Sequence, residues 1–195
     1  MRSFLIVGNK AVTKPFSLRD LAGGAGRMDI ICRCIAQSLF ISHGIRRDVS
    51  VYVLLLGNPD PPKALKILGN EVRYMAPDER NIAGLIKKAL ALEVDRKWRR
   101  STPGIYIARK SLRDLLEDLS REFKVVYLRE DGVDIRSVAC SLKNPVFILG
   151  DHIGLKREDE ELVLEYADLV VSVSRISLQA DQCITIVHYE MDRCI

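Results

Sequence analysis

Short runs of apolar residues recur along the chain and alternate with segments whose apolar positions follow a helical period. Uninterrupted apolar runs are typical of buried strands, and a 3.6-residue period is typical of amphipathic helices. The runs predict strands at 2–9, 50–57, 63–69, 71–75, 104–108, 124–130, 145–151 and 168–174. The periodic segments predict helices at 28–42, 77–94, 111–123, 134–142, 157–167 and 178–193.

From residue 104 onward, strands and helices alternate strictly. This alternation predicts an α/β fold in which helices cover both faces of a mostly parallel sheet. A length of 195 residues suits a single domain, 1–195. Ligands of such sheets bind beyond the carboxyl ends of the strands, so the loops after Leu128, Gly150 and Ser172 are expected to form one site.

Composition changes this interpretation in two ways. With 48% hydrophobic residues the chain is not disordered, and its apolar runs are too short to cross a bilayer. The first residues lack the pattern of a signal peptide, so a soluble, cytoplasmic protein is expected. Residues 1–110 carry 20 Lys and Arg against 9 Asp and Glu, whereas 111–195 carry 10 against 17. The first part therefore forms either a face for a polyanion or a set of solvated helix faces.

The cysteines do not suggest a metal site. The five cysteines are scattered without a Cys-x-x-Cys pair, and only three histidines accompany them, so no structural metal is expected. Reduced thiols are the rule in cytosol. The high share of charged residues, with few Asn and Gln, is weakly typical of thermophilic proteins. A disulfide is possible in such a protein, and it could involve Cys194.

Several familiar catalytic motifs are absent. Residues 150–157 lack the Gly-Lys-Ser/Thr ending of a P-loop, and the glycines at 23–26 do not directly follow a strand as a dinucleotide fingerprint requires. Cys183 and His188 are five residues apart on one predicted helix, which separates their side chains, so Cys183 is better interpreted as a buried thiol. His152 on an extended loop is more typical of a structural or capping residue than of a general base.

What remains at the predicted site is a loop of small residues and exposed amides. Such a pocket suits a cofactor that carries its own electrophile, because the protein then only positions donor and acceptor. S-adenosylmethionine (SAM) is such a cofactor, although the pattern also permits other ligands.

Two long stretches carry a family resemblance. "FILGDHIGL" and "SVSRISLQADQCITIVHYEMD" resemble the cofactor region of the SPOUT methyltransferases. "GRMDIICRCIAQSLFISHGIRRDVSVYVLLLGNPDPPKAL" and "PDERNIAGLIKKAL" resemble the archaeal enzymes that methylate N1 of pseudouridine 54 in the tRNA T-loop. The resemblance covers nearly the whole chain. It implies a C-terminal trefoil knot over about 124–195, SAM as cofactor, pseudouridine-containing tRNA as substrate and a homodimer.

Two alternatives stay open at this point. A related ribosome-biogenesis family methylates N1 of a pseudouridine in small-subunit rRNA, although its usual insertions are not visible here. The chain could also be a non-catalytic RNA-binding assembly factor that keeps the pocket.

The resemblance also implies the cofactor residues. These are Leu128, Gly150, Val173, Ser174, Arg175, Ile176, Ser177, Leu178 and Cys183. Gly150 lacks a Cβ atom, so the backbone there could approach the adenosyl group closely. From the residues alone, Ser174 and Ser177 could equally cap the last helix, and Cys183 could belong to the core.

Methylation of pseudouridine at N1 requires the N1 proton to leave, with a cation or donor steadying charge on the ring carbonyls. The catalytic candidates are Asp29, as proton acceptor or orienting group, with Arg27 and Arg46 as cations. The alternative is that Asp29 is a helix N-terminal charge and the arginines lie on a solvated face.

The RNA-binding candidates are cationic. They are Arg47, Arg96, Lys97, Arg99 and Arg100, and Trp98 among them could stack on an unpaired base or be buried in an interface or core. The last helix carries more apolar positions than one packing face needs. We expect these to serve partly the knot and partly a dimer surface: Ile184, Ile186, Val187 and Tyr189.

Overall fold

The computed structural model describes residues 1–194. Its main feature is an eight-stranded sheet, with strands β1 (Arg2–Gly8), β4 (Val49–Leu55), β5 (Lys63–Leu68), β6 (Arg99–Thr102), β7 (Ile105–Ala108), β8 (Lys124–Asp134), β9 (Pro145–Gly150) and β10 (Leu169–Ser172). The helices are α1 (Met28–Leu39), α2 (Glu79–Leu90), α3 (Leu112–Glu122), α4 (Ile135–Val138), α5 (Arg157–Tyr166) and α6 (Ala180–Asp192). A short 3-10 turn, Ala139–Ser141, and a small hairpin, β2 (Phe40–Ile41) and β3 (Gly44–Ile45), complete the set. The predicted domain ends at residue 195, which lies outside the described residues.

The strands are ordered β10-β8-β9-β1-β4-β5-β7-β6. The first five are parallel to one another, as the alternation of strands and helices predicted. The α/β class with a mostly parallel sheet is therefore confirmed. β5, β7 and β6 extend the sheet in antiparallel fashion, because β4 is joined to β5 by a short loop rather than by a helix.

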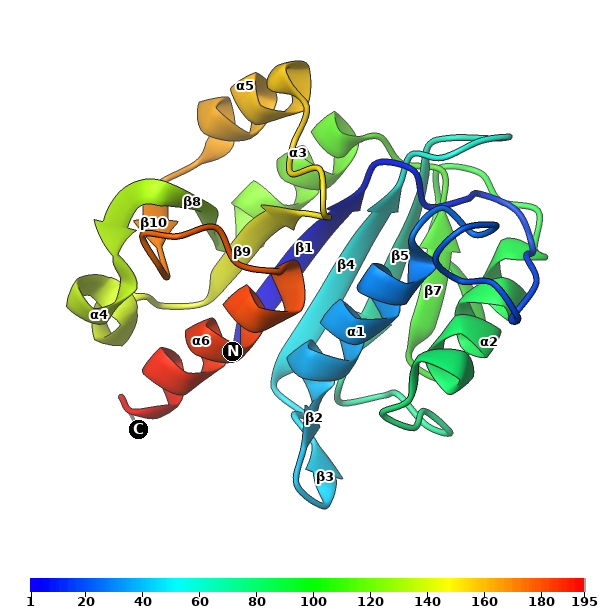
Figure 1. The fold of residues 1–195 in the computed structure, drawn as a ribbon, viewed down its shortest axis with the longest axis horizontal. Coiled ribbons are helices and arrows are strands. Elements are labelled where there is room, and N and C mark those ends of the chain that lie inside the picture. Colours follow the sequence, from blue (N-terminus) through cyan, green and yellow to red (C-terminus); the bar gives the residue numbers. More distant parts are fainter. Residues whose placement is uncertain (195) are drawn as a thin grey trace.

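Helices cover the sheet on both faces (Figure 1). Successive side chains of a strand point to opposite faces, so Phe4 and Ile6 of β1 join the cluster under α1, α2 and α6. Leu5 and Val7 join the second cluster, under α3 and α5. Every residue of β1 is buried, which explains why its sequence is a continuous apolar run.

Several local predictions differ from the structure. β8 continues to Asp134, so no loop follows Leu128, and the helix expected over 134–142 is a short helix followed by a 3-10 turn. Residues 71–75 form turns and loop rather than a strand. The amides of Glu71 and Val72 both donate to the carbonyl oxygen of Leu68, which turns the chain out of the sheet. The charged stretch at 96–100, for which no strand was expected, leads into the edge strand β6.

The end of α6 is tied to the start of β1. His188 Nε2 donates to the Ser38 carbonyl oxygen at 2.9 Å, and its Nδ1 accepts from the Arg2 guanidinium at 3.2 Å. Burial, together with two nearby arginines, lowers the pKa of His188 to about 4. A disulfide joins Cys194 to Cys140, which settles the question that the composition left open. No helix among the described residues has both the length and the apolar composition to cross a membrane.

Candidate functional site

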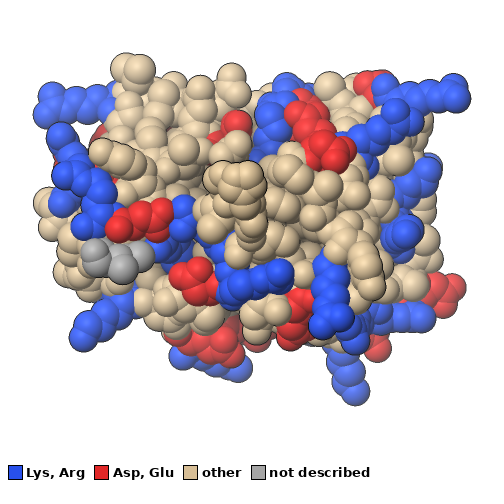
Figure 2. Space-filling view, turned by 90° about the horizontal axis from the view of Figure 1, so that it is seen from below, with Lys and Arg blue, Asp and Glu red and all other residues tan. Residues whose placement is uncertain are grey.

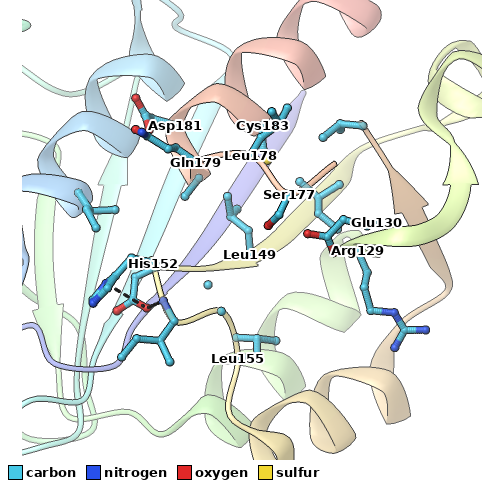
Figure 3. A pocket seen from close by; sticks show the side chains of 18 of the residues that line it. Arg129, Glu130, Leu149, His152, Leu155, Ser177, Leu178, Gln179, Asp181 and Cys183 are labelled. Atoms are coloured by element: carbon cyan, nitrogen blue, oxygen red, sulfur yellow. Dashed lines mark hydrogen bonds and ion pairs between the residues drawn. The ribbon is translucent and has the colours of Figure 1, made fainter. Parts of the chain in front are cut away.

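A cavity of about 490 Å³ opens at the carboxyl end of β9, beside residues 127–130 of β8 and between the N-terminal ends of α1 and α6 (Figure 3). This is the edge where the strand rule placed a ligand site. Its size is in the range of small-molecule and cofactor pockets. The predicted cofactor residues that line it are Leu128, Gly150, Val173, Ser174, Ile176, Ser177, Leu178 and Cys183. Arg175 does not line it, and borders a second groove on the other side of the segment.

Gly150 serves a structural purpose besides the one inferred for it. A Cβ atom at this position would lie 2.5 Å from Gly154 O and 2.7 Å from Gly154 Cα. The small residue therefore lets the loop 150–154 close on itself, rather than only letting a ligand approach. Gly154 has φ of +78°, a left-handed conformation in which glycine carries no Cβ strain.

A buried side-chain pair holds this loop against the end of β1. Asp151 accepts from the backbone amide of Asn9 at 2.8 Å and from its side-chain amide at 2.8 Å. The same Asn9 amide group donates to the Gly154 carbonyl oxygen at 2.7 Å. Asp151 also accepts from the Ile153 amide, and its carboxylate is therefore used up in shaping the loop. His152 lines the cavity, with its Nδ1 3.7 Å from an Asp151 oxygen.

The segment before α6 forms the opposite wall. α6 is capped by Gln179 and Gln182 in a reciprocal capping box, so Ser174 and Ser177 do not cap this helix. Ser174 Oγ instead accepts from the Ile176 amide within the wall. Burial raises the pKa of the Cys183 thiol to about 11, so it is a neutral, weakly nucleophilic group at physiological pH.

The side of the cavity formed by α1 and the residue before it carries an ion cluster. Arg27, whose φ is +64°, donates to both carboxylate oxygens of Asp29 at 3.0 Å. Arg33 donates to Asp29 at 3.1 Å and lies 3.9 Å from Asp181, which connects the N-terminal ends of α1 and α6. The hydrogen bonds from Arg27, helped by Arg33, hold the pKa of Asp29 below its usual range. Asp29 is thus ionised and held by two arginines that line the cavity, whereas Asp29 itself is buried and does not line it.

The structure does not bring Arg46 to this cluster. α1 separates Asp29 from Arg46, and a 12-residue helix is about 18 Å long. Arg46 instead makes a bidentate pair with Asp192 at 2.6 and 3.0 Å. A catalytic role for Arg46 thus stays a prediction, because within one chain Arg46 lies far from the cavity.

The RNA-binding candidates lie away from the cavity. Arg47 donates to the carbonyl oxygens of Gly69 and Val72, and Arg96 pairs with Asp114. Arg99 donates to a backbone carbonyl, and Lys97 and Arg100 are exposed. Figure 2 views the molecule from the side of the β2–β3 hairpin and shows cationic side chains spread over that face with acidic ones between them.

Several residues of the site escaped prediction from the sequence, among them Arg33, Glu130 and Asp181. Figure 3 shows the Glu130 carboxylate near Ser177, whereas Arg129 extends away, toward α5. Asp181 Oδ1 is buried and has no hydrogen-bond partner among the described residues. The acidic first turn of a helix is the only sequence signal for Asp181, and it is also explained by the helix dipole.

Residues 1–194 match a family model described as "Putative SAM-dependent RNA methyltransferase". The chain belongs to this family. It is 48% identical to a tRNA (pseudouridine(54)-N(1))-methyltransferase of Methanosarcina acetivorans, over 99% of this chain and 92% of that protein. A protein with the same name from Methanocella arvoryzae is 48% identical over 99% and 100%, and one from Methanocaldococcus jannaschii is 45% identical over 99% and 97%.

A solved structure shares the fold. Archaeoglobus fulgidus Nep1, bound to S-adenosylhomocysteine, superposes with a TM-score of 0.63 at 18% identity, over 99% of this chain and 97% of that one. The family resemblance inferred from the sequence is confirmed by these findings. SAM as cofactor and the methyltransferase class are confirmed with it.

Proposed function

We propose that this protein transfers the methyl group of SAM to N1 of pseudouridine 54 in the T-loop of tRNA. The observation that carries the proposal is the cavity beside β8 and β9, lined by Arg27 and Arg33, the two arginines that hold Asp29 ionised. Near-full-length identity to proteins named for this activity specifies the substrate.

The residues present fit SAM. SAM supplies an activated methyl group when bound, so the wall needs no nucleophile. The loop 150–154 offers main-chain groups, and Leu128, Leu149 and Leu178 offer apolar surface to an adenosyl group. The unpartnered Asp181 Oδ1 is available to a hydroxyl or ammonium donor, and such a donor would satisfy a buried acceptor.

On the acceptor side, Asp29 takes the N1 proton or orients the base, and Arg27 steadies charge on a ring carbonyl. Arg33 keeps one Asp29 oxygen fixed while Arg27 can turn toward RNA. Arg46 contributes only if it reaches the cavity of a second subunit, because its own chain holds it at Asp192.

Four further features belong to the proposal. Residues 1–195 form a single domain, and the part from about 124 onward forms a trefoil knot, in keeping with the strand order β10-β8-β9-β1. The protein is a homodimer and acts in the cytoplasm. Support for the dimer comes from Tyr189, 59% exposed, and Ile176, 69% exposed, whereas Ile184 and Val187 are buried in the core.

The test is methyl transfer from labelled SAM to three RNAs. These are tRNA pseudouridylated at position 54, the same tRNA with uridine there, and a pseudouridine-containing fragment of small-subunit rRNA. We expect label in the first RNA alone. Label only in the rRNA fragment would favour ribosome biogenesis, and label in none, with SAM still binding, would favour a non-catalytic RNA-binding factor.

A further inference from the structure

Helices cover the second face of the sheet only in part. α3 and α5 pack on β1, β4, β8 and β9, whereas β5, β7 and β6 present polar and aromatic side chains on that face. In the strand register, Tyr52 pairs with Lys66, Lys66 with Tyr106, and Tyr106 with Arg100. Directly opposed residues project from the same face of a sheet, so these four side chains form a row across β4, β5, β7 and β6.

Trp98 lies beside this row and completes it. The Lys66 ammonium is 4.8 Å from the centre of the Trp98 ring and 4.9 Å from that of Tyr106. Lys110 approaches the same indole, at 5.8 Å. The Lys66 ammonium has no carboxylate within 4.0 Å among residues 1–194, so two aromatic rings are its direct neighbours. Partial burial lowers the pKa of Lys66, because removal of the ammonium from water disfavours its charged form.

Nearby acids engage other members of the neighbourhood. The Tyr106 hydroxyl donates to Glu71 at 2.6 Å, and Lys110 pairs with Asp118 at 2.8 Å. These contacts fix the Tyr106 ring and Lys110. Trp98 is half-buried, and the Arg100 side chain is exposed.

We propose that this aromatic row (Tyr52, Lys66, Trp98, Tyr106 and Arg100) binds an unpaired nucleotide of the tRNA substrate by stacking, with Lys66 and Arg100 on the adjacent phosphates. This inference rests on the proposed function for the identity of the RNA. Aromatic rings interleaved with cations are the chemistry that recognises single-stranded segments, because every base has a stacking face and every link a phosphate. A phosphate would also give the Lys66 ammonium a direct ion-pair partner, where Glu71, Glu122 and Asp118 now favour its charge only from a distance.

The chain contains a single tryptophan, so its fluorescence reports on this row alone. Titration of the protein with tRNA pseudouridylated at position 54 should quench Trp98 fluorescence, with the same midpoint as a filter-binding curve. Unchanged Trp98 fluorescence at saturating tRNA would overturn the proposal, and this measurement needs no variant. Methyl transfer is assayed in parallel. Methylation without quenching would refute nucleotide binding at the aromatic row while supporting the proposed activity. Quenching without methylation would support binding at the row while refuting the proposed activity.

Variants separate stacking from charge. Trp98→Leu should weaken tRNA binding about tenfold with an unchanged salt dependence. Lys66→Gln should weaken it and lower the slope of log K against log salt by about one. Lys88→Gln removes the same charge from exposed α2, on the other face, and should bind like the wild type. SAM affinity, measured by calorimetry, should be retained in all three, which excludes misfolding. Equal tRNA affinity of Lys66→Gln, Trp98→Leu and the wild type would refute the assignment.

Discussion

Replacement of Gly150 by alanine tests how the cofactor wall is built. The added Cβ would lie 2.5 Å from Gly154 O, whereas ordinary contacts of this kind begin near 3.4 Å. The atoms in the way are backbone atoms, which cannot turn aside as a side chain does. The Gly154 carbonyl carbon lies nearer still, so the loop 150–154 must open by about 1 Å, against the hydrogen bonds that Asn9 and Asp151 make across it.

The displaced loop is a wall of the cavity, so the effect should appear mainly in cofactor affinity. Overpacking of this kind costs about 1–3 kcal/mol, and a 1 Å misplacement in a site can cost about 100-fold. We expect the Kd for SAM, measured by calorimetry, to rise between about 10-fold and 100-fold. The loop follows the carboxyl end of β9 and lies outside the hydrophobic core, so thermal unfolding should remain cooperative.

Gly84→Ala is the matched control. A Cβ at Gly84, in the middle of α2, would meet nothing within 4 Å. This variant should bind SAM as the wild type does and gain about 1 kcal/mol in stability, because alanine is the better helix former. A Gly150→Ala protein whose Kd for SAM stays within twofold of the wild-type value would refute the loop-closure reasoning.

Three other predictions concern stability and catalysis. Reduction of the Cys140–Cys194 disulfide, which spans 54 residues, should lower the free energy of unfolding by up to about 4 kcal/mol in denaturant melts, and identical melts with and without reductant would contradict this. The pKa of His188 is lowered to about 4, so the unfolded chain binds the extra proton first, and stability should fall by up to roughly 3 kcal/mol as pH drops from about 6.5 toward 4. His188→Asn should remove this dependence, and a wild-type curve that is flat over the same range would be inconsistent with it. Asp29→Asn should reduce the methyl-transfer rate by about 100-fold or more with unchanged SAM affinity, whereas a wild-type rate across pH would exclude the base role.

Much of the fold could be predicted because the central strands are buried on both faces. The apolar runs of β1, β4 and β9 indicate buried strands whatever their neighbours are. β6 could not be recognised in this way, because it is an edge strand and its positions carry Arg99, Arg100 and Thr102. The segment 71–75 alternates like a strand, but hydrogen bonds to Leu68 turn it out of the sheet.

For the site, the sequence predicted which loops form it but not which side chains meet there. The strand rule located the loop after β9 and the neighbourhood of Leu128, which lies within β8, and the resemblance supplied the residues around 173–183. Asn9, however, bonds to Asp151 across 142 residues, and Arg33 meets Asp181 only because α1 and α6 pack side by side. Arg46 pairs with Asp192, which is 146 residues away in the sequence. Such partners are set by tertiary packing and leave no local pattern in the chain.

The central claim is that the methyl group reaches N1 of one particular pseudouridine. Its most direct test is a single-turnover reaction on tRNA pseudouridylated at position 54, followed by nuclease digestion and mass spectrometry of the fragments. The account predicts 1-methylpseudouridine at position 54, and nowhere else. A methyl group on a ribose hydroxyl, on another nucleotide, or on the tRNA that carries uridine at this position would contradict it.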